Sequence, residues 1–265
     1  IGSGEAGIGS WIEACAERFP EWTLCISDRL RESEYGAGEP LQRAAARQKT
    51  KILDNLHLMV SMRSFRAEKV SAFVKALLDC DEEAARQYAA GFHDRYPIVV
   101  TRDLAAAKRW VQHQARANQR YGLLASSKAM RLKPHAIDIR VEADPAKYFL
   151  GESDDVRSSY YLEDCATEFQ VQGLELDWTI VTWDADLRKT DNDWSFHDFR
   201  GSRWQNIQSA ENRRNLRNAY RVLLTRARQG MAIFVPPGSL EDPTRPPSFY
   251  NHTAAYLRRL GMREL

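Results

Sequence analysis

The sequence lacks the usual signatures of a self-sufficient nucleotide site. A phosphate-binding loop of the G-x-x-x-x-G-K-S/T type needs a lysine directly after its last glycine, and no Gly-Lys dipeptide occurs in the 265 residues. The stretch 2–7 (GSGEAG) fits the spacing of a dinucleotide-binding G-x-G-x-x-G loop, but no strand precedes it. Nothing in the chain therefore holds a nucleotide unaided.

Metal-binding patterns are missing as well. The four cysteines form no C-x-x-C pair and the six histidines form no H-E-x-x-H motif, so no zinc site or redox dithiol is recognisable. Asp184 and Asp186 follow an apolar run, but paired acids at a strand end are more often loop caps, and no third ligand is evident. We therefore predict no metal site.

Long apolar runs and a strong net charge are also absent. No run approaches the roughly 18 consecutive apolar residues of a membrane helix, and the sequence does not open like a secretory signal. The net charge is only +2, so any nucleic-acid site must be a local patch. These absences predict a cytoplasmic protein with no membrane partner. The glycine-rich opening has no initiator methionine, which predicts a fragment excised from a longer protein.

What is present is an alternation of strand and helix patterns, which predicts a parallel sheet with crossover helices. Gly230 stands where a glycine that ends the last of these helices belongs. The expected helices cover 11–18, 68–78, 103–117 and 213–228, and the expected strands cover 22–27, 97–101, 121–125, 159–164, 178–183 and 231–235.

The same pattern predicts the domain organisation. A short α/β piece over 1–30 precedes a polar stretch that predicts a linker over 31–50, and a large α/β domain follows over 51–265. The segment at about 184–208 interleaves arginines with aromatic residues and has little period, so it is interpreted as an insertion. It is either a packed unit with its own small core or a stacking platform for single strands.

Two segments carry the strongest functional signal. The first, 166–177 (ATEFQVQGLELD), precedes an apolar strand, and the second, 220–228 (YRVLLTRAR), follows about 50 residues later. They resemble motifs V and VI of superfamily 1 helicases. Together with RSFR at 63–66, ASSK at 125–128 and FRGSRW at 199–204, they make nearly the whole chain resemble the bacterial branch of the Schlafen-group-3-like DNA/RNA helicase family.

This resemblance implies a RecA-like second motor domain of the P-loop NTPase type that lacks the Walker A loop, with residues 1–30 as the tail of the first motor domain. Arg63 matches the motif IV arginine that approaches the nucleotide phosphates, Gly173 and Glu175 match the motif V positions that meet the nucleotide, and Arg226 matches the arginine finger of motif VI. The phosphate-loop lysine and the magnesium-binding acids would belong to an N-terminal motor domain. ATP and Mg²⁺ are then cofactors of the longer protein, and the fragment alone is expected to be inactive.

A physical argument supports Arg226 independently. Phosphoryl transfer depends on positive charge placed against the oxygens of the departing group, and a planar guanidinium suits that role. On the expected helix over 213–228, Arg226 and Arg228 lie about 200° apart, so only one of them can face a ligand. We choose Arg226, and interpret Arg228 as a cation at the negative end of the helix dipole.

Single-stranded DNA or RNA is the predicted partner, beside the N-terminal motor domain of the same protein. We expect the strand to meet polar and aromatic residues of the strand-end loop and of the insertion, namely Ser126, Ser127, Trp194, Arg200, Arg203 and Trp204. The leading hypothesis is an ATP-dependent helicase or translocase. The alternative is a non-catalytic nucleic-acid-binding or scaffolding module that keeps the fold, and a nuclease ranks last because no convincing acid cluster is present.

Overall fold

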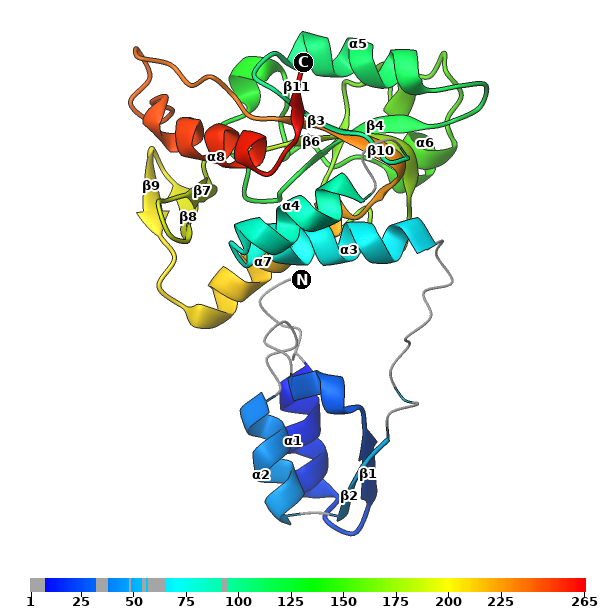
Figure 1. The fold of residues 1–265 in the computed structure, drawn as a ribbon, viewed down its shortest axis with the longest axis vertical. Helices are drawn as coiled ribbons and strands as arrows, with labels where there is room; N and C mark the ends of the chain where they lie inside the picture. The colour runs from blue at the N-terminus through cyan, green and yellow to red at the C-terminus, as the bar shows by residue number, and fades with distance from the viewer. Residues whose placement is uncertain (1–7, 32–37, 48, 54–55, 57–64, 92–94) are drawn as a thin grey trace. The chain divides into compact units, whose positions relative to one another are not determined.

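The computed structural model describes the chain except for residues 1–7, 32–37, 48, 54–55, 57–64 and 92–94. Two compact units, Ile1–Met62 and Arg63–Leu265, make up the chain (Figure 1). The stretch 31–50, predicted to be a linker, contains a helix that packs in the first unit. This part of the chain therefore belongs to the first unit, and the division between units falls further along the sequence than predicted.

The first unit combines two helices with two parallel strands: α1 (Ile8–Arg18), β1 (Thr23–Ile26), α2 (Gly38–Arg47) and β2 (Lys49–Ile52). A 3-10 turn, η1 (Asp28–Arg31), follows β1. Ile12 and Ala16 lie four residues apart on one face of α1, and they pack with Leu41 and Ala44 of α2 and with Ile26 of β1. The expected helix at 11–18 and strand at 22–27 are thus confirmed.

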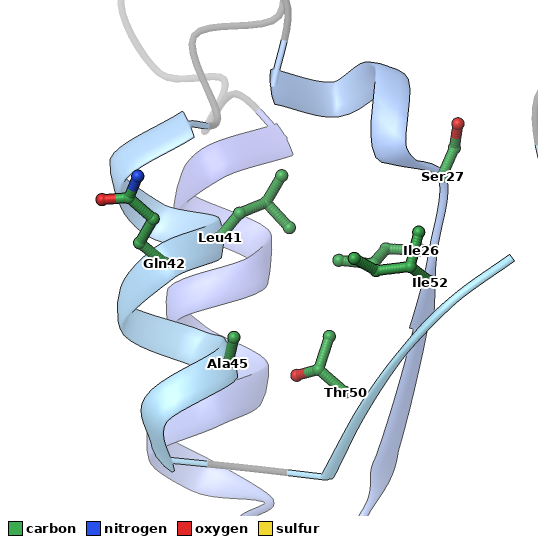
Figure 2. A pocket seen from close by; sticks show the side chains of 7 residues that line it. All are labelled: Ile26, Ser27, Leu41, Gln42, Ala45, Thr50 and Ile52. Atoms are coloured by element: carbon green, nitrogen blue, oxygen red, sulfur yellow. The ribbon is translucent and has the colours of Figure 1, made fainter. Parts of the chain in front are cut away.

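A small pocket opens beside α2 in this unit (Figure 2). None of its lining side chains is ionisable, so it offers no charged anchor for a phosphate. The lining residues are Ile26, Ser27, Leu41, Gln42, Ala45, Thr50 and Ile52.

The second unit is built on a six-stranded sheet in which every pair of neighbours is parallel. This confirms the predicted α/β class. In spatial order the strands are β11 (Arg263–Glu264), β3 (Ile98–Thr101), β10 (Ala227–Phe234), β6 (Leu176–Thr182), β4 (Tyr121–Ala125) and β5 (Cys165–Ala166).

Helices cover both faces of this sheet. Figure 1 shows α5 on one side, and α3, α4 and α7 on the other. Alternate strand residues explain this: Val99 and Ile180 pack with the α5 core, whereas Val100 and Val181 pack with the core on the opposite face. The helices are α3 (Phe65–Leu78), α4 (Glu82–Ala90), α5 (Leu104–Gln114), α6 (Pro145–Leu150), α7 (Ala210–Leu224) and α8 (Ser248–Arg259).

Two expected elements are wrong. The strand predicted over 159–164 is instead a 3-10 turn, η4 (Ser159–Tyr161), capped by the Ser158 side chain, and only the residues of β5 pair with β4. The helix predicted over 213–228 ends at Leu224, because the chain turns at Thr225 and enters β10 at Ala227.

The changed helix end alters the interpretation of three residues. Gly230 lies inside β10 rather than at a helix terminus, and a Cβ there would come within 2.5 Å of the Pro97 carbonyl oxygen. Arg226 stands at the junction between α7 and β10, and Arg228 lies in the strand. The argument that placed the two arginines on opposite sides of one helix is therefore wrong.

The insertion forms a three-stranded antiparallel sheet: β7 (Leu187–Lys189), β8 (Trp194–Arg200) and β9 (Arg203–Asn206). Its Trp194 ring stacks on Trp183 at 5.4 Å between centroids and meets Tyr256 of α8 edge-on at 5.6 Å. The insertion is thus ordered, and one face of it extends the core of the second unit.

Candidate nucleotide and nucleic-acid sites

The two helicase-like segments meet at the amino edge of the sheet, where β6 and β10 begin. Leu176 pairs with Ala227 in the parallel register, and the Leu176 amide donates to the Arg226 carbonyl at 3.1 Å. Gly173 and Glu175 lie directly before β6, so they come to the same edge as Arg226. Segments about 50 residues apart in the sequence therefore form one surface.

Arg226 is nearly buried at this edge, with 8% of its surface exposed. Its Nε donates to the Val222 carbonyl at 3.1 Å, in the last turn of α7, where the helix dipole is negative. Its Nη1 reaches the Val171 carbonyl and its Nη2 the Thr225 hydroxyl, both at 3.5 Å. The guanidinium therefore joins the end of α7 to the segment that carries Gly173.

Gly173 has the backbone conformation that favours glycine, with φ of +87°, and a Cβ there would meet nothing within 4 Å. Leu174, which follows it, and Phe169, four residues before it, are 41% and 44% exposed. The turn is closed by the Leu174 amide, which donates to the Val171 carbonyl at 3.1 Å. The main chain around Gly173 is consequently open to a ligand.

Glu175 accepts from Arg228 Nε at 3.1 Å across β6 and β10. The side chain of Arg228 is 61% exposed and that of Glu175 is 20% exposed. Arg228 is therefore an ion-pair partner on a strand and not a helix-terminal cation, which corrects its interpretation. Sequence reasoning missed this pair, because only the strand pairing brings residues 175 and 228 together. Arg63, the predicted motif IV arginine, lies outside the described residues.

The carboxyl edge of the sheet holds the predicted strand-end serines. Ser126 is fully buried, which does not favour its predicted contact with a nucleic-acid strand; that contact stays a prediction. The Ser127 amide and hydroxyl both donate to the Glu168 carboxylate, at 2.9 and 2.6 Å. Glu168 lies near the start of the motif V-like segment, which also contains Gly173. These two hydrogen bonds therefore connect the carboxyl edge to the start of that segment.

The β8–β9 hairpin presents the other predicted nucleic-acid residues. Arg200 and Arg203 pair in register next to its turn, and both are exposed. Asp198 accepts from Arg200 at 2.9 Å and from Lys128 at 3.3 Å, which links the hairpin to the carboxyl edge. Trp204 is half-buried, and its indole nitrogen donates to the Thr244 carbonyl at 2.8 Å.

Trp194 does not share this surface. It is only 4% exposed and lies in the core of the second unit. A base could stack on its ring only if that core opened, so burial does not favour the stacking role predicted for Trp194, which stays a prediction.

The acids Asp184 and Asp186 are buried among hydrogen bonds rather than set around a cavity. Asp184 accepts from the Arg131 amide at 2.7 Å and the Tyr250 hydroxyl at 3.0 Å, and Asp186 accepts from the Tyr220 hydroxyl at 2.6 Å. Burial is the main cause that raises the pKa of Asp186 to about 7, and the neighbouring Asp184 charge contributes to this rise. Among the described residues, no group of three potential metal-ligating side chains occurs.

A parallel sheet with helices on both faces is consistent with a RecA-like α/β domain. The family model of the Schlafen group 3, DNA/RNA helicase domain matches residues 14–237. This match covers most of the chain, which therefore belongs to that family. No curated protein matches the sequence. In the part of the chain that the structure describes, no helix is long and apolar enough to span a membrane.

Proposed function

We propose that this chain is the second motor domain of an ATP-dependent DNA or RNA helicase or translocase. Its task is to bring motif V- and motif VI-type residues to an ATP site that it shares with another motor domain. Membership of the Schlafen group 3 helicase family supports a helicase-related role. The observation that carries the proposal is the meeting of Arg226 with the Gly173 segment at the amino edge of two adjacent central strands.

The geometry of Arg226 suits a group that acts only when the two motor domains close. Its Nε contact of 3.1 Å anchors the side chain to α7. Its two Nη contacts of 3.5 Å, to the Val171 carbonyl and the Thr225 hydroxyl, are longer than ordinary hydrogen bonds. A γ-phosphoryl group that gains negative charge on its outer oxygens is a better acceptor, and the guanidinium would stabilise the transition state.

The residues at this edge fit the phosphates of ATP better than they fit Mg²⁺. Arg226 and Arg228 supply positive charge, and the main chain at Gly173 is open to an anion. The acid of this edge, Glu175, already accepts from Arg228. We therefore assign phosphate contacts to Arg226 and Gly173 and a nucleotide contact to Glu175, and assign the magnesium ligands to the other motor domain. For Arg63, which lies outside the described residues, a phosphate contact is proposed from the motif IV resemblance alone.

For the nucleic-acid strand we propose contacts with Arg200, Arg203, Trp204 and Ser127. The two arginines are exposed beside one hairpin turn, where they would meet backbone phosphates. Trp204 is half-buried, with Phe199 and the Arg188 guanidinium against its ring at 5.1 and 5.3 Å, and we propose that it stacks on one base. DNA and RNA both carry the phosphates and bases that such a surface recognises.

The test uses the longer protein in which this chain is joined to a motor domain with a phosphate-binding loop. Arg226→Ala should lower kcat by about 10³-fold or more, with a much smaller effect on ATP binding, because the arginine acts chiefly in the transition state. Arg226→Lys should restore little, since an ammonium lacks the planar fork. Thermal unfolding of each variant separates lost activity from lost fold.

Arg258→Ala is the control for removing an arginine outside the proposed site, because it deletes an arginine paired with Glu264 at 3.1 Å, far from the amino edge in the sequence. If Arg226→Ala keeps a near-parental kcat, Arg226 is not the finger. If the parent protein binds nucleic acid but never hydrolyses ATP, the chain is the non-catalytic binding module.

A further inference from the structure

Arg228 lies on an irregularity of β10. Along the pairing with β6, Ala227 is opposite Leu176 and Gly230 is opposite Trp178, so three steps on β10 match two on β6. This is a β-bulge, which inserts one extra residue and redirects the side chains it carries. A bulge between parallel strands is uncommon, and this one begins directly after Arg226, between Ala227 and Gly230.

Gly230 keeps the bulge in place. A Cβ at this position would lie 2.5 Å from the Pro97 carbonyl oxygen and 2.8 Å from the Trp178 ring. The absence of a side chain lets β10 return to close packing against β3 immediately after the bulge. Arg228 therefore leaves the sheet from a fixed main-chain position rather than from a loose strand end.

The two arginines of the edge differ in exposure and in partners. Arg226 is 8% exposed and contacts carbonyls of its own domain, whereas the side chain of Arg228 is 61% exposed. Glu175, which comes from the other helicase-like segment, balances the charge of Arg228 at 3.1 Å. The amino edge thus carries one nearly buried guanidinium and one exposed guanidinium that a carboxylate holds.

We propose that Arg228 is a second phosphate-binding arginine of this edge, and that the polyphosphate chain of a nucleotide binds it by displacing Glu175. This inference rests on the proposed ATP site. The Arg228 partner of this ion pair is 61% exposed, and an ion pair that solvent reaches is weak, so exchanging it costs little. A phosphate offers the guanidinium two parallel charge-assisted hydrogen bonds in return. Arg228 then contributes to ground-state binding, and Arg226 contributes to the transition state.

The exchange would also couple phosphate binding at Arg228 to the conformation of the motif V-like segment. Glu175 lies two residues after Gly173, whose turn is open, so loss of the Arg228 contact releases one restraint on that segment. If the Arg228–Glu175 ion pair were purely structural, its contribution to stability would not depend on any anion, and breaking it would not change phosphate binding.

A double-mutant cycle in the joined protein separates these two roles. The four proteins are the parent, Glu175→Gln, Arg228→Ala and the double variant, and the probe is inorganic tripolyphosphate measured by calorimetry. Tripolyphosphate has no sugar or base, so a contact of Glu175 with the rest of a nucleotide does not enter. Arg228→Ala should weaken its binding about tenfold. Glu175→Gln should tighten it about two- to fivefold, because the anion no longer competes with a carboxylate.

The tightening by Glu175→Gln should vanish in the Arg228→Ala background. In turnover, Arg228→Ala should raise the KM for ATP and leave kcat within a few fold, the reverse of the split expected for Arg226→Ala. Parental tripolyphosphate binding by Arg228→Ala, or an equal effect of Glu175→Gln in both backgrounds, would overturn the inference. If the parent binds neither ATP nor tripolyphosphate, the proposed function itself fails. Arg258→Ala, which breaks an exposed Arg-Glu pair elsewhere, should match the parent.

Discussion

Asp186→Asn tests the buried carboxyl pair that follows β6. Asp186 is fully buried, and its Oδ1 accepts from the Tyr220 hydroxyl and from the Leu187 amide. Burial is the main cause that raises its pKa to about 7, the charge of Asp184 adds to the shift, and hydrogen bonds from Tyr220 and Ser126 oppose it. An asparagine keeps an acceptor oxygen and is neutral at every pH.

The sign of the effect follows from proton binding. In the unfolded chain Asp186 has its ordinary pKa of 3.8, so between pH 4 and 7 the folded protein holds a proton that the unfolded chain has lost. This contribution to stability therefore falls as the pH rises through that window. Each pKa unit corresponds to about 1.4 kcal/mol, so the pH-dependent contribution of the carboxyl pair to the free energy of unfolding approaches about 4 kcal/mol, and part of it belongs to Asp184.

Chemical unfolding of the parent and of Asp186→Asn at pH values from 4 to 8 measures this difference. The stability of the variant relative to the parent should rise by about 2–4 kcal/mol across the range. His197 has the opposite slope between pH 4 and 6.5, because burial lowers its pKa to about 4, but it is present in both proteins and cancels. A flat difference profile would refute the reasoning.

Asp242→Asn is the opposite-sign control for this measurement. Hydrogen bonds from Thr244, Arg245 and Arg131 lower the pKa of Asp242, so its carboxylate stabilises the folded state above its ordinary pKa and loses that effect in acid. The difference in stability between the Asp242→Asn variant and the parent should therefore be flat from pH 4 to 8, and the deficit of the variant should shrink only when the measurement is extended below about pH 4.

Two further predictions concern the insertion. Trp194→Ala should lower the free energy of unfolding by about 3–5 kcal/mol because it empties a packed core site. Under folding conditions this variant should bind single strands with unchanged affinity. Trp204→Ala should weaken single-strand affinity and leave the salt dependence of binding nearly unchanged. A fluorescence titration in which Trp194→Ala is fully folded and binds poorly would contradict this. Replacing Arg200 and Arg203 with alanine should reduce the slope of log K against log salt by about two, and an unchanged slope would remove the hairpin from the proposed strand path.

The sequence alone was sufficient for the α/β class and for the central strands. The runs at 97–101, 121–125 and 178–183 are mostly apolar because helices cover both faces of the parallel sheet. Such runs can be recognised from the sequence alone. The two helicase-like segments could also be recognised from the sequence, because the residues of each segment are contiguous. Their meeting at one edge then follows from strand pairing.

The end of α7 was not predictable in the same way. Residues 220–228 contain leucine, alanine and arginine, which favour a helix locally, and no signal marks the turn at Thr225. The chain leaves the helix there because Ala227 pairs with Leu176 and the following residues complete the central strand of the sheet. That pairing, remote in sequence, placed Arg228 on a bulge beside Glu175.

The sequence by itself determined which residue types the insertion carries, and the tertiary structure decided which of them a ligand can reach. Trp194 and Trp204 look alike in a run of interleaved arginines and aromatics. Trp183, which directly follows β6, and Tyr256 of α8 cover Trp194, whereas Trp204 lies on another strand and is only half-buried. Burial depends on what packs against a side chain from elsewhere in the chain, and local pattern contains no record of that packing.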